Sequence, residues 1–593
     1  MPQVLAPDGQ TYVVPGVYTS IQAALNGAGP LPEFQVPVLI ADSYAGYPSN
    51  FTTNTGRLDS ELNLLPFLDI GNTTTCQEIF GAASDLSIIY ANAKRNGLPR
   101  AWCIGAGQMV RAKIIVRSTG PVAQFDIVGY YWGFLANWTK IRFTSGGIFG
   151  YRVPQKISKI TTNVTAGDYR IYVDDNSWAV PGMAIEIGDN NTANSPAVVY
   201  AKGVELSTTG QPRYWIRLLA AASDAYATAD YAAIALYGSG VSLSPAFSSG
   251  QGQDLIDWIN TTRVLKAQRI AASFTGALPI AIASLTALKD ISTWGTMTPG
   301  TAPASSASTY TDFVSAMNDG LWERFITQAG VFPRAWYVGS SASDVHAVWR
   351  DYALQERAAS RGYPISVTTG CAWGDTDLSA SNSTNPVYRS GLLNSQDIDL
   401  GASGADGQAA YLTLAPAAWG RLCSGGLPHN LTNDPLEGFT TFEATWNEAG
   451  LGELTTLCRG GVFTYINRFL RGAVTPVISQ GLSTLQANTQ LWFNLGSEGY
   501  TWSRQQRDLA DFVDRNIKID FMNQVIGLEV DVNIVRTTLV TRGQQLITRG
   551  ILVSFRVISV TRNIEANGWD FLWNAELPGL TDYVTGTTTI IFS

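Results

Sequence analysis

Trp502-Ser503-Arg504-Gln505-Gln506-Arg507 opens the stretch, residues 502–593, that decides how the rest of this chain is interpreted. Apolar residues then recur at helical spacing in two successive runs, namely Leu509, Phe512, Val513 and Ile517, followed by Val532, Val535, Leu539 and Leu546. Gly550 is expected to end the second helix, because glycine adopts the left-handed cap conformation without strain. The run after Gly550 alternates between apolar and polar positions, which predicts a strand, with one face formed by Ile551, Val553, Phe555 and Val557.

The sequence then closes with a β-branched run, Thr587-Thr588-Thr589-Ile590-Ile591-Phe592-Ser593. Such a run predicts a strand, yet it leaves no residues after it with which to form a local hairpin. A strand in this position must fray, pair with a distant part of its own chain, or pair with another chain.

Composition bounds the class of protein. A length of 593 residues predicts three or four domains at roughly 150 residues per domain. Hydrophobic residues make up 45%, which excludes a disordered chain, whereas charged residues make up only 15%, below the roughly 25% of an average soluble domain. This shortage of charge favours an assembly subunit, whose surface is covered by neighbouring subunits, rather than a soluble secreted β protein. The net charge of -8 gives no basic field, so we expect no direct contact with nucleic acid.

Neither targeting nor redox chemistry is indicated. The N-terminal residues lack the basic region and apolar core of a signal peptide, and the apolar stretch 277–288 is too short to span a membrane. We therefore expect a protein made in the cytoplasm, without membrane insertion. The five cysteines form no Cys-x-x-Cys pair, which predicts buried free thiols, with an inter-subunit disulfide as the alternative.

The first half of the chain alternates strands and helices. Residues 10–14 are strand-like, Val36–Ala41 predicts a strand, and Thr75-Cys76-Gln77-Glu78 predicts a capped helix start. A helix over Asp85–Asn96 is predicted to turn Leu86, Ile89, Tyr90 and Ala93 inward. It is ended by Gly97 and leads directly into a strand at 101–104. Strand, helix and strand at this spacing are typical of an α/β fold.

The predicted secondary structure changes to short strands between about residues 151 and 265. Short strands at 169–173, 183–187 and 214–218 are separated by Asp- and Asn-rich turns, which predicts an inserted β-barrel or sandwich. After this insert we expect helices over 310–329 and 344–360 with a strand at 336–338 between them. Two long loops are predicted at 296–309 and 375–406.

A search for chemistry finds no catalytic, cofactor-binding or metal-binding residues. His346 is expected to pack in a helix, His429 falls in a loop, and no nucleophile elbow or phosphate-binding loop occurs. Asp174 and Asp175, with Asp189 further on, suit either calcium or two β-turns, and the turns are favoured. A carboxylate pair for glycoside hydrolysis stays open, since only distances in space define one. The aromatic run 130–132 favours core packing over stacking on a ligand.

Several segments together resemble the tail sheath proteins of contractile bacteriophage tails and related injection machines. Near the N-terminus the resemblance lies in Val14-Pro15-Gly16-Val17-Tyr18, and further on in Glu78–Gly81, Tyr90–Gly97, Arg100–Ile104 and Asn137–Ile141. Late in the chain it lies in Gly452–Leu457 and Gly460–Asn467, followed by the two helices and the strand after Gly550 in the family's order. Residues 150–265 lie outside the resemblance, where the family carries a variable outward insertion.

The resemblance implies an α+β multidomain fold. It comprises an N-terminal arm (1–25), an α/β sheath core (26–150 and 266–430), an outward-facing β insert (151–265), a tube-facing C-terminal α/β domain (431–562) and a C-terminal arm (563–593). In this family, terminal strands add to the sheet of neighbouring C-terminal domains through main-chain hydrogen bonds. The residues implied here are Tyr12, Val13, Val14, Pro15, Gly16, Val17 and Tyr18 from one arm, Thr588, Thr589, Ile590, Ile591 and Phe592 from the other, and Ile551, Val553, Phe555 and Val557 as the receiving strand.

The function that the resemblance implies is that of a virion tail-sheath subunit, assembled in the bacterial cytoplasm and not an enzyme. Its partners would be further copies in stacked hexameric rings, the tail tube protein, and the baseplate and terminator proteins. Contraction would drive the tube through the host envelope. The alternatives are another virion structural protein, such as a baseplate or capsid subunit, and a polysaccharide-degrading virion enzyme.

Overall fold

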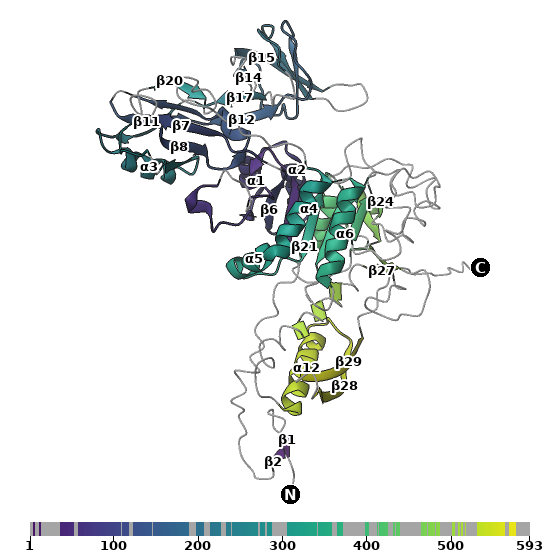
Figure 1. The fold of residues 1–593 in the computed structure, drawn as a ribbon. Coiled ribbons are helices and arrows are strands. Elements are labelled where there is room, and N and C mark those ends of the chain that lie inside the picture. Colours follow the sequence, from purple (N-terminus) through teal and green to yellow (C-terminus); the bar gives the residue numbers. More distant parts are fainter. Residues whose placement is uncertain are drawn as a thin grey trace, which may run out of the picture.

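The fold is given by a computed structural model, which describes 4–5, 11–12, 36–51, 57–107, 109–117, 123–144, 146–188, 197–206, 214–226, 233–238, 240–270, 273–278, 282–287, 305–340, 342–357, 365–371, 398–402, 412, 414–424, 431–432, 434–438, 464–470, 473–480, 482–486, 501–503, 508–509, 512–513, 516–517, 531–563 and 568–576. The molecule is elongated (Figure 1). Inserted β structure lies at one end, an α/β core in the middle, and a small C-terminal unit at the other end.

A six-stranded sheet forms the centre of the core. Its order is β23-β22-β21-β3-β6-β5, and every pairing is parallel except that of β5 with β6. These strands are β3 (Pro37–Asp42), β5 (Leu68–Ile70), β6 (Ala101–Ala106), β21 (Ala335–Gly339), β22 (Ser366–Cys371) and β23 (Ile398–Ala402). Residues 38–41 of β3 are completely buried, as expected for a parallel strand covered on both faces.

Helices cover this sheet. They are α1 (Thr73–Phe80), α2 (Asp85–Arg95), α4 (Ala307–Ala316), α5 (Trp322–Ala329), α6 (Ser343–Arg357) and α8 (Leu414–Cys423). In α2 the side chains of Leu86, Ile89, Tyr90 and Ala93 are buried, which confirms the predicted inward face. Helices α4 and α6 lie side by side on the sheet (Figure 1), where Trp336 packs 5.1 Å from Trp349, centre to centre.

Three local predictions for the core were wrong. Helix α1 begins at Thr73 and is capped by Asn72, whose side chain accepts a hydrogen bond from the Thr75 amide, so the box at 75–78 is not the cap. The helix predicted over 310–329 starts at Ala307 and is interrupted by a π-helical segment, η5 (Met317–Leu321), in which Gly320 has φ 99°. Strand β23 lies inside the loop predicted at 375–406, because the short run Ile398–Ala402 within this polar stretch pairs as an edge strand beside β22.

The inserted β structure forms three sheets. One contains β7 (Lys113–Arg117), β8 (Ala123–Gly129) and β19 (Leu265–Arg269), with α3 (Gly252–Thr261) packed against β19. A second contains β10 (Lys140–Phe143), β11 (Ile148–Arg152), β18 (Ser242–Ala246) and β20 (Ile282–Ala287). Residues 113–150 and 265–287, which the sequence assigned largely to the core, thus form strands of these sheets.

The third sheet has six strands in the order β12-β17-β14-β15-β16-β13. They are β12 (Pro154–Lys159), β13 (Arg170–Val173), β14 (Ala184–Gly188), β15 (Ala197–Leu206), β16 (Tyr214–Leu218) and β17 (Ala233–Tyr237). The edge strands β12 and β13 also meet, since the Thr161 amide donates to the Tyr172 carbonyl at 3.0 Å and the Asp174 amide donates to the Lys159 carbonyl at 3.1 Å. We call this six-stranded sheet the distal sheet.

A buried ionic cluster joins the core to the inserted sheets. The Glu61 carboxylate, at the end of η2 (Asp59–Glu61), is fully buried and accepts two hydrogen bonds from Arg111, at 2.6 and 2.9 Å. The Lys266 ammonium of β19 lies 2.5 Å from the same carboxylate. Burial alone would raise the pKa of Glu61, but the two cations hold it below the usual value.

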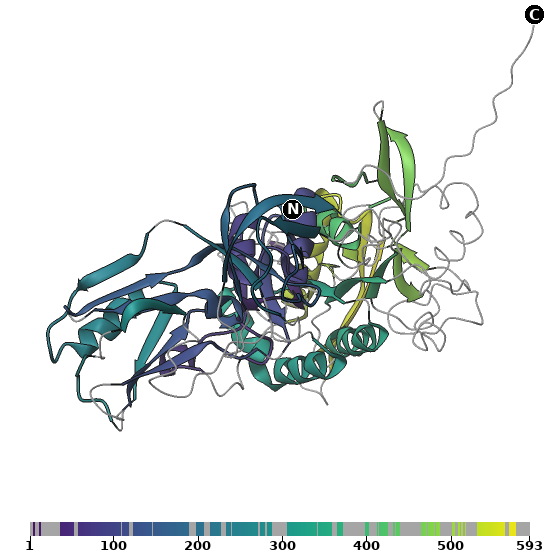
Figure 2. The ribbon, with the colours of Figure 1, turned by 90° about the horizontal axis from the view of Figure 1, so that it is seen from above.

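Short links complete this part of the fold. Strand β4 (Ala45–Gly46) pairs with β9 (Trp132–Gly133), and η3 (Leu135–Trp138) leads into β10. On the far side of the core lie the β24 (Thr464–Leu470) and β25 (Ala473–Gln480) hairpin and the paired strands β26 (Leu482–Gln486) and β27 (Thr501–Ser503). Seen from above, the inserted sheets extend from one side of the core and the β24–β25 hairpin from the other (Figure 2).

Candidate assembly surface

The C-terminal unit consists of a helix packed on a hairpin. Helix α12 (Val532–Thr548) is capped by Asp531, whose carboxylate accepts hydrogen bonds from the Asn533 amide at 2.7 Å and the Ile534 amide at 3.0 Å. It ends before Gly550, which has φ 72° as predicted. Strands β28 (Ser554–Asn563) and β29 (Gly568–Glu576) follow as an antiparallel pair.

One face of the hairpin packs against α12. Phe555 stacks on Trp573 with ring centres 5.4 Å apart, and the Phe555 ring lies directly over Gly543, where a larger residue would clash. A second, shorter helical stretch contributes Leu509, Phe512, Val513 and Ile517, all buried, to the same hydrophobic cluster. Both helical runs predicted from the sequence are therefore confirmed, and they meet in one small core.

The predicted receiving strand differs in its boundaries. Ile551 and Val553 precede β28, with Ile551 buried and Val553 exposed, because the residues after Gly550 first cross from the end of α12 to the hairpin. Phe555 and Val557 do lie in β28 and face the helix. A register shift between Val557 and Ser559 then moves the buried position to Val560.

The outer face and edges of this hairpin are uncovered within the described residues. There β28 pairs only with β29, so each strand retains an outer edge. Ile558 and Leu572 are 45% and 54% exposed. A two-stranded sheet is marginal in water, and an edge strand presents unpaired main-chain donors and acceptors. The hairpin is thus suited to accept further strands.

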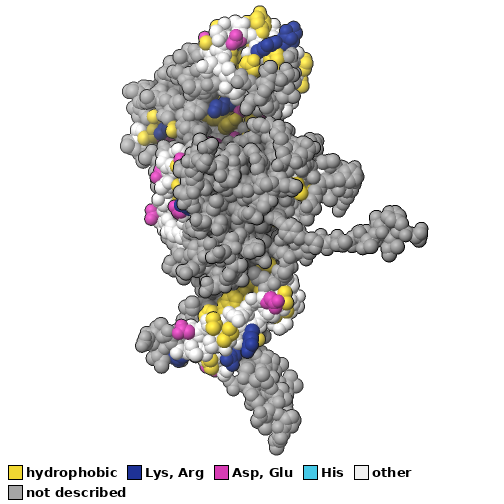
Figure 3. All heavy atoms as spheres, turned by 90° about the vertical axis from the view of Figure 1, so that its right-hand side faces the viewer, with side chains coloured by type: hydrophobic (Ala, Val, Ile, Leu, Met, Phe, Trp, Pro, Cys, Tyr) yellow, Lys and Arg dark blue, Asp and Glu magenta, His cyan; other side chains and the backbone are white. Residues whose placement is uncertain are grey.

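Charge is distributed unevenly over this unit. Between Val532 and Asn563 the sequence contains five arginines and no aspartate or glutamate, in a chain whose net charge is -8. In the lower part of Figure 3, hydrophobic and basic side chains lie next to one another on the surface of this unit. The exposed side of α12 carries Arg536, Val540 and Gln544 at helical spacing.

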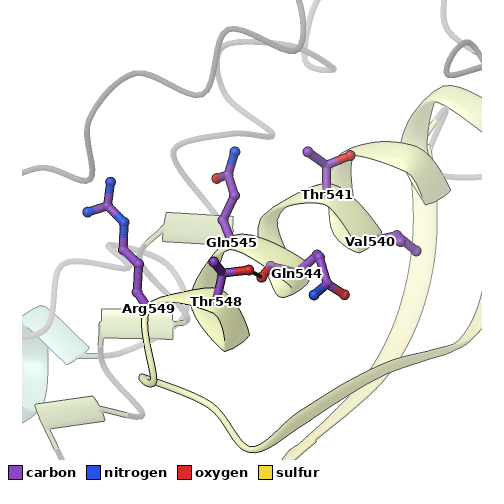
Figure 4. A pocket seen from close by; sticks show the side chains of 6 residues that line it. All are labelled: Val540, Thr541, Gln544, Gln545, Thr548 and Arg549. Atoms are coloured by element: carbon purple, nitrogen blue, oxygen red, sulfur yellow. Dashed lines mark hydrogen bonds between the residues drawn. The ribbon is translucent and has the colours of Figure 1, made fainter.

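A shallow groove runs along this side of α12. Figure 4 shows the side chains that line it, Val540, Thr541, Gln544, Gln545, Thr548 and Arg549. Its volume is about 460 Å³. The lining combines Val540 with amide, hydroxyl and guanidinium side chains, and most of its accessible surface is apolar.

A buried ion pair anchors the unit to the core. The Arg334 guanidinium, next to β21, lies 2.7 Å from the Asp508 carboxylate, and both side chains are almost completely buried. The backbone amide of Arg334 also donates to the Val36 carbonyl at 3.1 Å, which fixes it beside the central strands. The pair therefore links the C-terminal unit directly to the residue that precedes the core strand β21.

The residues of the two predicted arms are mostly outside the described part of the chain. Tyr12 lies in β2 (Thr11–Tyr12), which pairs with β1 (Val4–Leu5) in a small antiparallel hairpin. Residues 13–18 and 588–592 fall outside the described residues. The exchange of strands between copies therefore stays a prediction.

Other residues considered from the sequence have structural roles. His346 is buried, and its Nε2 atom lies 2.8 Å from the Ser340 carbonyl and 3.0 Å from the Thr369 hydroxyl; burial lowers its pKa to about 4, so the ring is neutral. Asp175 accepts from the Ser177 amide at 2.9 Å, as in a turn. His429 and Asp189 lie outside the described residues.

Aromatic and sulfur-containing side chains considered from the sequence also have structural roles. Trp132 is buried against Phe51, which confirms core packing for that residue. Cys76, Cys103 and Cys423 are buried free thiols, as predicted. Within the described ranges, no group of three or more His, Cys, Asp or Glu residues is placed to hold a metal ion, and no helix is long and apolar enough to cross a membrane.

Comparison with known proteins gives one point of reference. No family model and no curated protein matches the sequence. Among solved structures, the chain is similar to the sheath tail protein from Desulfitobacterium hafniense, with 11% sequence identity and a TM-score of 0.47, over 95% of this chain and 100% of that chain.

Proposed function

We propose that this protein is a structural subunit of a contractile tail sheath, which polymerises around a tail tube by exchanging terminal strands and contracts to drive the tube through a host envelope. The observation that carries the proposal is the β28–β29 hairpin, which has a packed inner face but only two strands in the described part of the chain. Added strands on both outer edges would give a four-stranded sheet, within the usual size for an independently stable sheet.

The strands that would be added are those predicted from the sequence. Residues 12–14 of one neighbour and residues 588–592 of another would extend the hairpin, with main-chain hydrogen bonds supplying the connection. Such a contact is directional, since the donor and acceptor surfaces differ. It therefore propagates into a helical polymer rather than closing as a dimer. The closed arrangement of the distal sheet, a small barrel in this proposal, would face outward.

The exposed side of α12 is the part of the proposed subunit that would face the tube. Its support is the run from Val532 to Asn563, which contains five arginines and no acidic residue, while Asp531, Asp570 and Glu576 lie outside this run in the same unit. Charge complementarity at an interface acts mainly on partner choice and association rate. Arg536→Glu is therefore expected to slow assembly on an acidic tube, whereas Arg269→Glu, at an exposed position of β19, serves as the matched control.

Electron microscopy of the purified protein tests the main proposal. The full chain should form hollow tubes of uniform width, alone or with a tube as template. Ile590→Pro removes one main-chain donor from the C-terminal run and should abolish the tubes, while Ile590→Val should preserve them. Deletion of residues 587–593 should leave a folded monomer. Normal tubes from the Ile590→Pro and deletion variants would reject strand exchange by this run.

A further inference from the structure

A polar contact joins the loop after β3 in the core to the distal sheet. The Tyr44 backbone is fixed on the core side, because its amide donates to the Phe80 carbonyl at 2.9 Å and its carbonyl accepts from the Phe134 amide at 3.0 Å. Asp174 follows β13 and is held by its own backbone bond to Lys159. The Tyr44 hydroxyl and the Asp174 Oδ2 atom meet between the two.

The protons available at this contact indicate which protonation state of Asp174 suits it. The Tyr44 hydroxyl has one proton but lies within hydrogen-bond distance of two acceptors, Asp174 Oδ2 and the Ala83 carbonyl at 3.3 Å. A protonated Asp174 would donate to the tyrosine oxygen, which leaves the tyrosine proton for Ala83. The other carboxyl oxygen, Oδ1, already accepts from the Lys159 amide at 2.9 Å. With the acid protonated, the Asp174 contact and the Ala83 carbonyl each have a donor, whereas an ionised Asp174 takes the tyrosine proton for itself.

On balance, the surroundings of Asp174 favour the protonated acid. Burial, assisted by the negative charge of Asp175, raises the pKa of Asp174 to about 7, although hydrogen bonds from the Tyr44 hydroxyl and from the Lys159 and Asp175 amides oppose the shift. The Lys159 ammonium lies 5.9 Å from the centre of the Tyr44 ring. Asp85, at the start of α2, adds a further negative charge near the tyrosine.

Other contacts would hold the distal sheet in place if this one opened. Lys140 of β10 pairs with Glu186 of β14 at 2.6 Å, and the Tyr237 hydroxyl donates to the Trp138 carbonyl at 2.7 Å. A cleft of about 650 Å³, lined in part by α1, the start of β12 and Asp175, adjoins the Tyr44–Asp174 contact. Opening would therefore widen this cleft without detaching the distal sheet.

We propose that Tyr44 and Asp174 form a latch between the core and the distal sheet, closed while the Asp174 carboxyl group carries a proton and loosened when that proton leaves. The sign follows from the raised pKa. An acid that binds its proton more tightly in the closed state stabilises that state most below its ordinary pKa near 4, and this contribution is lost as the pH rises through about 7. The latch is independent of assembly and does not rest on the proposed function.

Hydrogen exchange at the Lys159 amide, which donates to Asp174, tests the latch. After correction for intrinsic rates, its protection in the wild type should fall by at least tenfold, and up to roughly a hundredfold, between about pH 5 and pH 8. Asp174→Asn keeps an acceptor for Lys159 and a donor for Tyr44 but cannot ionise, so its protection should stay constant over this range. Asp175→Asn, the control for a neighbouring acid, should retain the wild-type fall.

Two results would overturn the latch. One is a fall of less than tenfold in the wild type, and the other is an equal fall in Asp174→Asn. Tyr44→Phe provides a second variant if Asp174→Asn does not fold, because it removes the hydroxyl that links the two parts. Its Lys159 protection should be low at both pH values; full protection at pH 5 would contradict the role of Tyr44.

Discussion

Replacing one partner of the Arg334–Asp508 pair should release the C-terminal unit from the core. The two side chains are 0% and 1% exposed and lie 2.7 Å apart. Removing either one leaves a buried charge without its counterion, which typically costs about 3–5 kcal/mol. Arg334→Met and Asp508→Leu should therefore each destabilise the C-terminal unit by this amount, whereas the double variant should lie within about 2 kcal/mol of the wild type because an apolar pair of similar volume replaces the ions.

Native-state hydrogen exchange measures this effect locally, which matters because a chain with several units does not unfold in two states. Buried amides of α12, such as those of Leu539 and Leu546, should exchange roughly two to nearly four orders of magnitude faster in each single variant. Amides of β3 should change much less. The matched control is Arg100–Asp69, whose side chains are 56% and 37% exposed and whose loss should cost no more than about 1 kcal/mol.

The reasoning would be refuted if each single variant lost less than about 1 kcal/mol, as the exposed pair is expected to do. It would also fail if the double variant were as unstable as the two single variants added together. That second result would mean that Arg334 and Asp508 act through separate contacts rather than through each other.

Three further predictions concern other parts of the chain. Asn72→Ala removes the cap of α1 and should lower the free energy of opening of this helix by about 1 kcal/mol, measured by native-state hydrogen exchange at the buried Phe80 amide against Asn72→Asp. Glu61→Gln leaves Arg111 uncompensated and should cost about 3–5 kcal/mol near neutral pH. The difference from wild type should shrink as the pH falls through the lowered pKa of Glu61, where stability from the carboxylate is lost; a pH-independent difference would contradict this. Gly543→Val should overpack α12 against Phe555 and cost about 1–3 kcal/mol, seen as faster exchange in β28, with Val540→Ala as an exposed control.

Elements with strong local signals were predictable from the sequence. Helix α2 has a serine cap at Ser84, an apolar stripe and a glycine stop, and its observed end lies within one residue of the predicted end. The helix broken at Gly320 was predicted as continuous because its apolar period runs through the break, while a single glycine is only a weak signal against a helix. Strand β23 is a run of five residues inside a largely polar stretch, and no local pattern encodes its pairing with β22.

The junctions between units were not predictable, because their members are far apart in sequence. Glu61 and Lys266 are 205 residues apart in the sequence, and Tyr44 meets Asp174 only once the distal sheet has folded. In the candidate assembly surface, the sequence identified the two helices and the strand after Gly550. It did not identify the anchor to Arg334, since Asp508 is one acid among many in the composition.

The order of the core strands has a consequence for folding during synthesis on the ribosome. Strand β3 needs β6 on one side, which follows shortly after it, and β21 on the other, about 300 residues later. At about 5–20 residues per second, the nascent chain would wait roughly 15–60 s for that second partner. During this interval the inserted sheets, which have apolar clusters of their own, can fold. Meanwhile one edge of the apolar strand β3 stays unpaired. We therefore expect the central strand to be the chief site at which cellular chaperones engage the nascent chain.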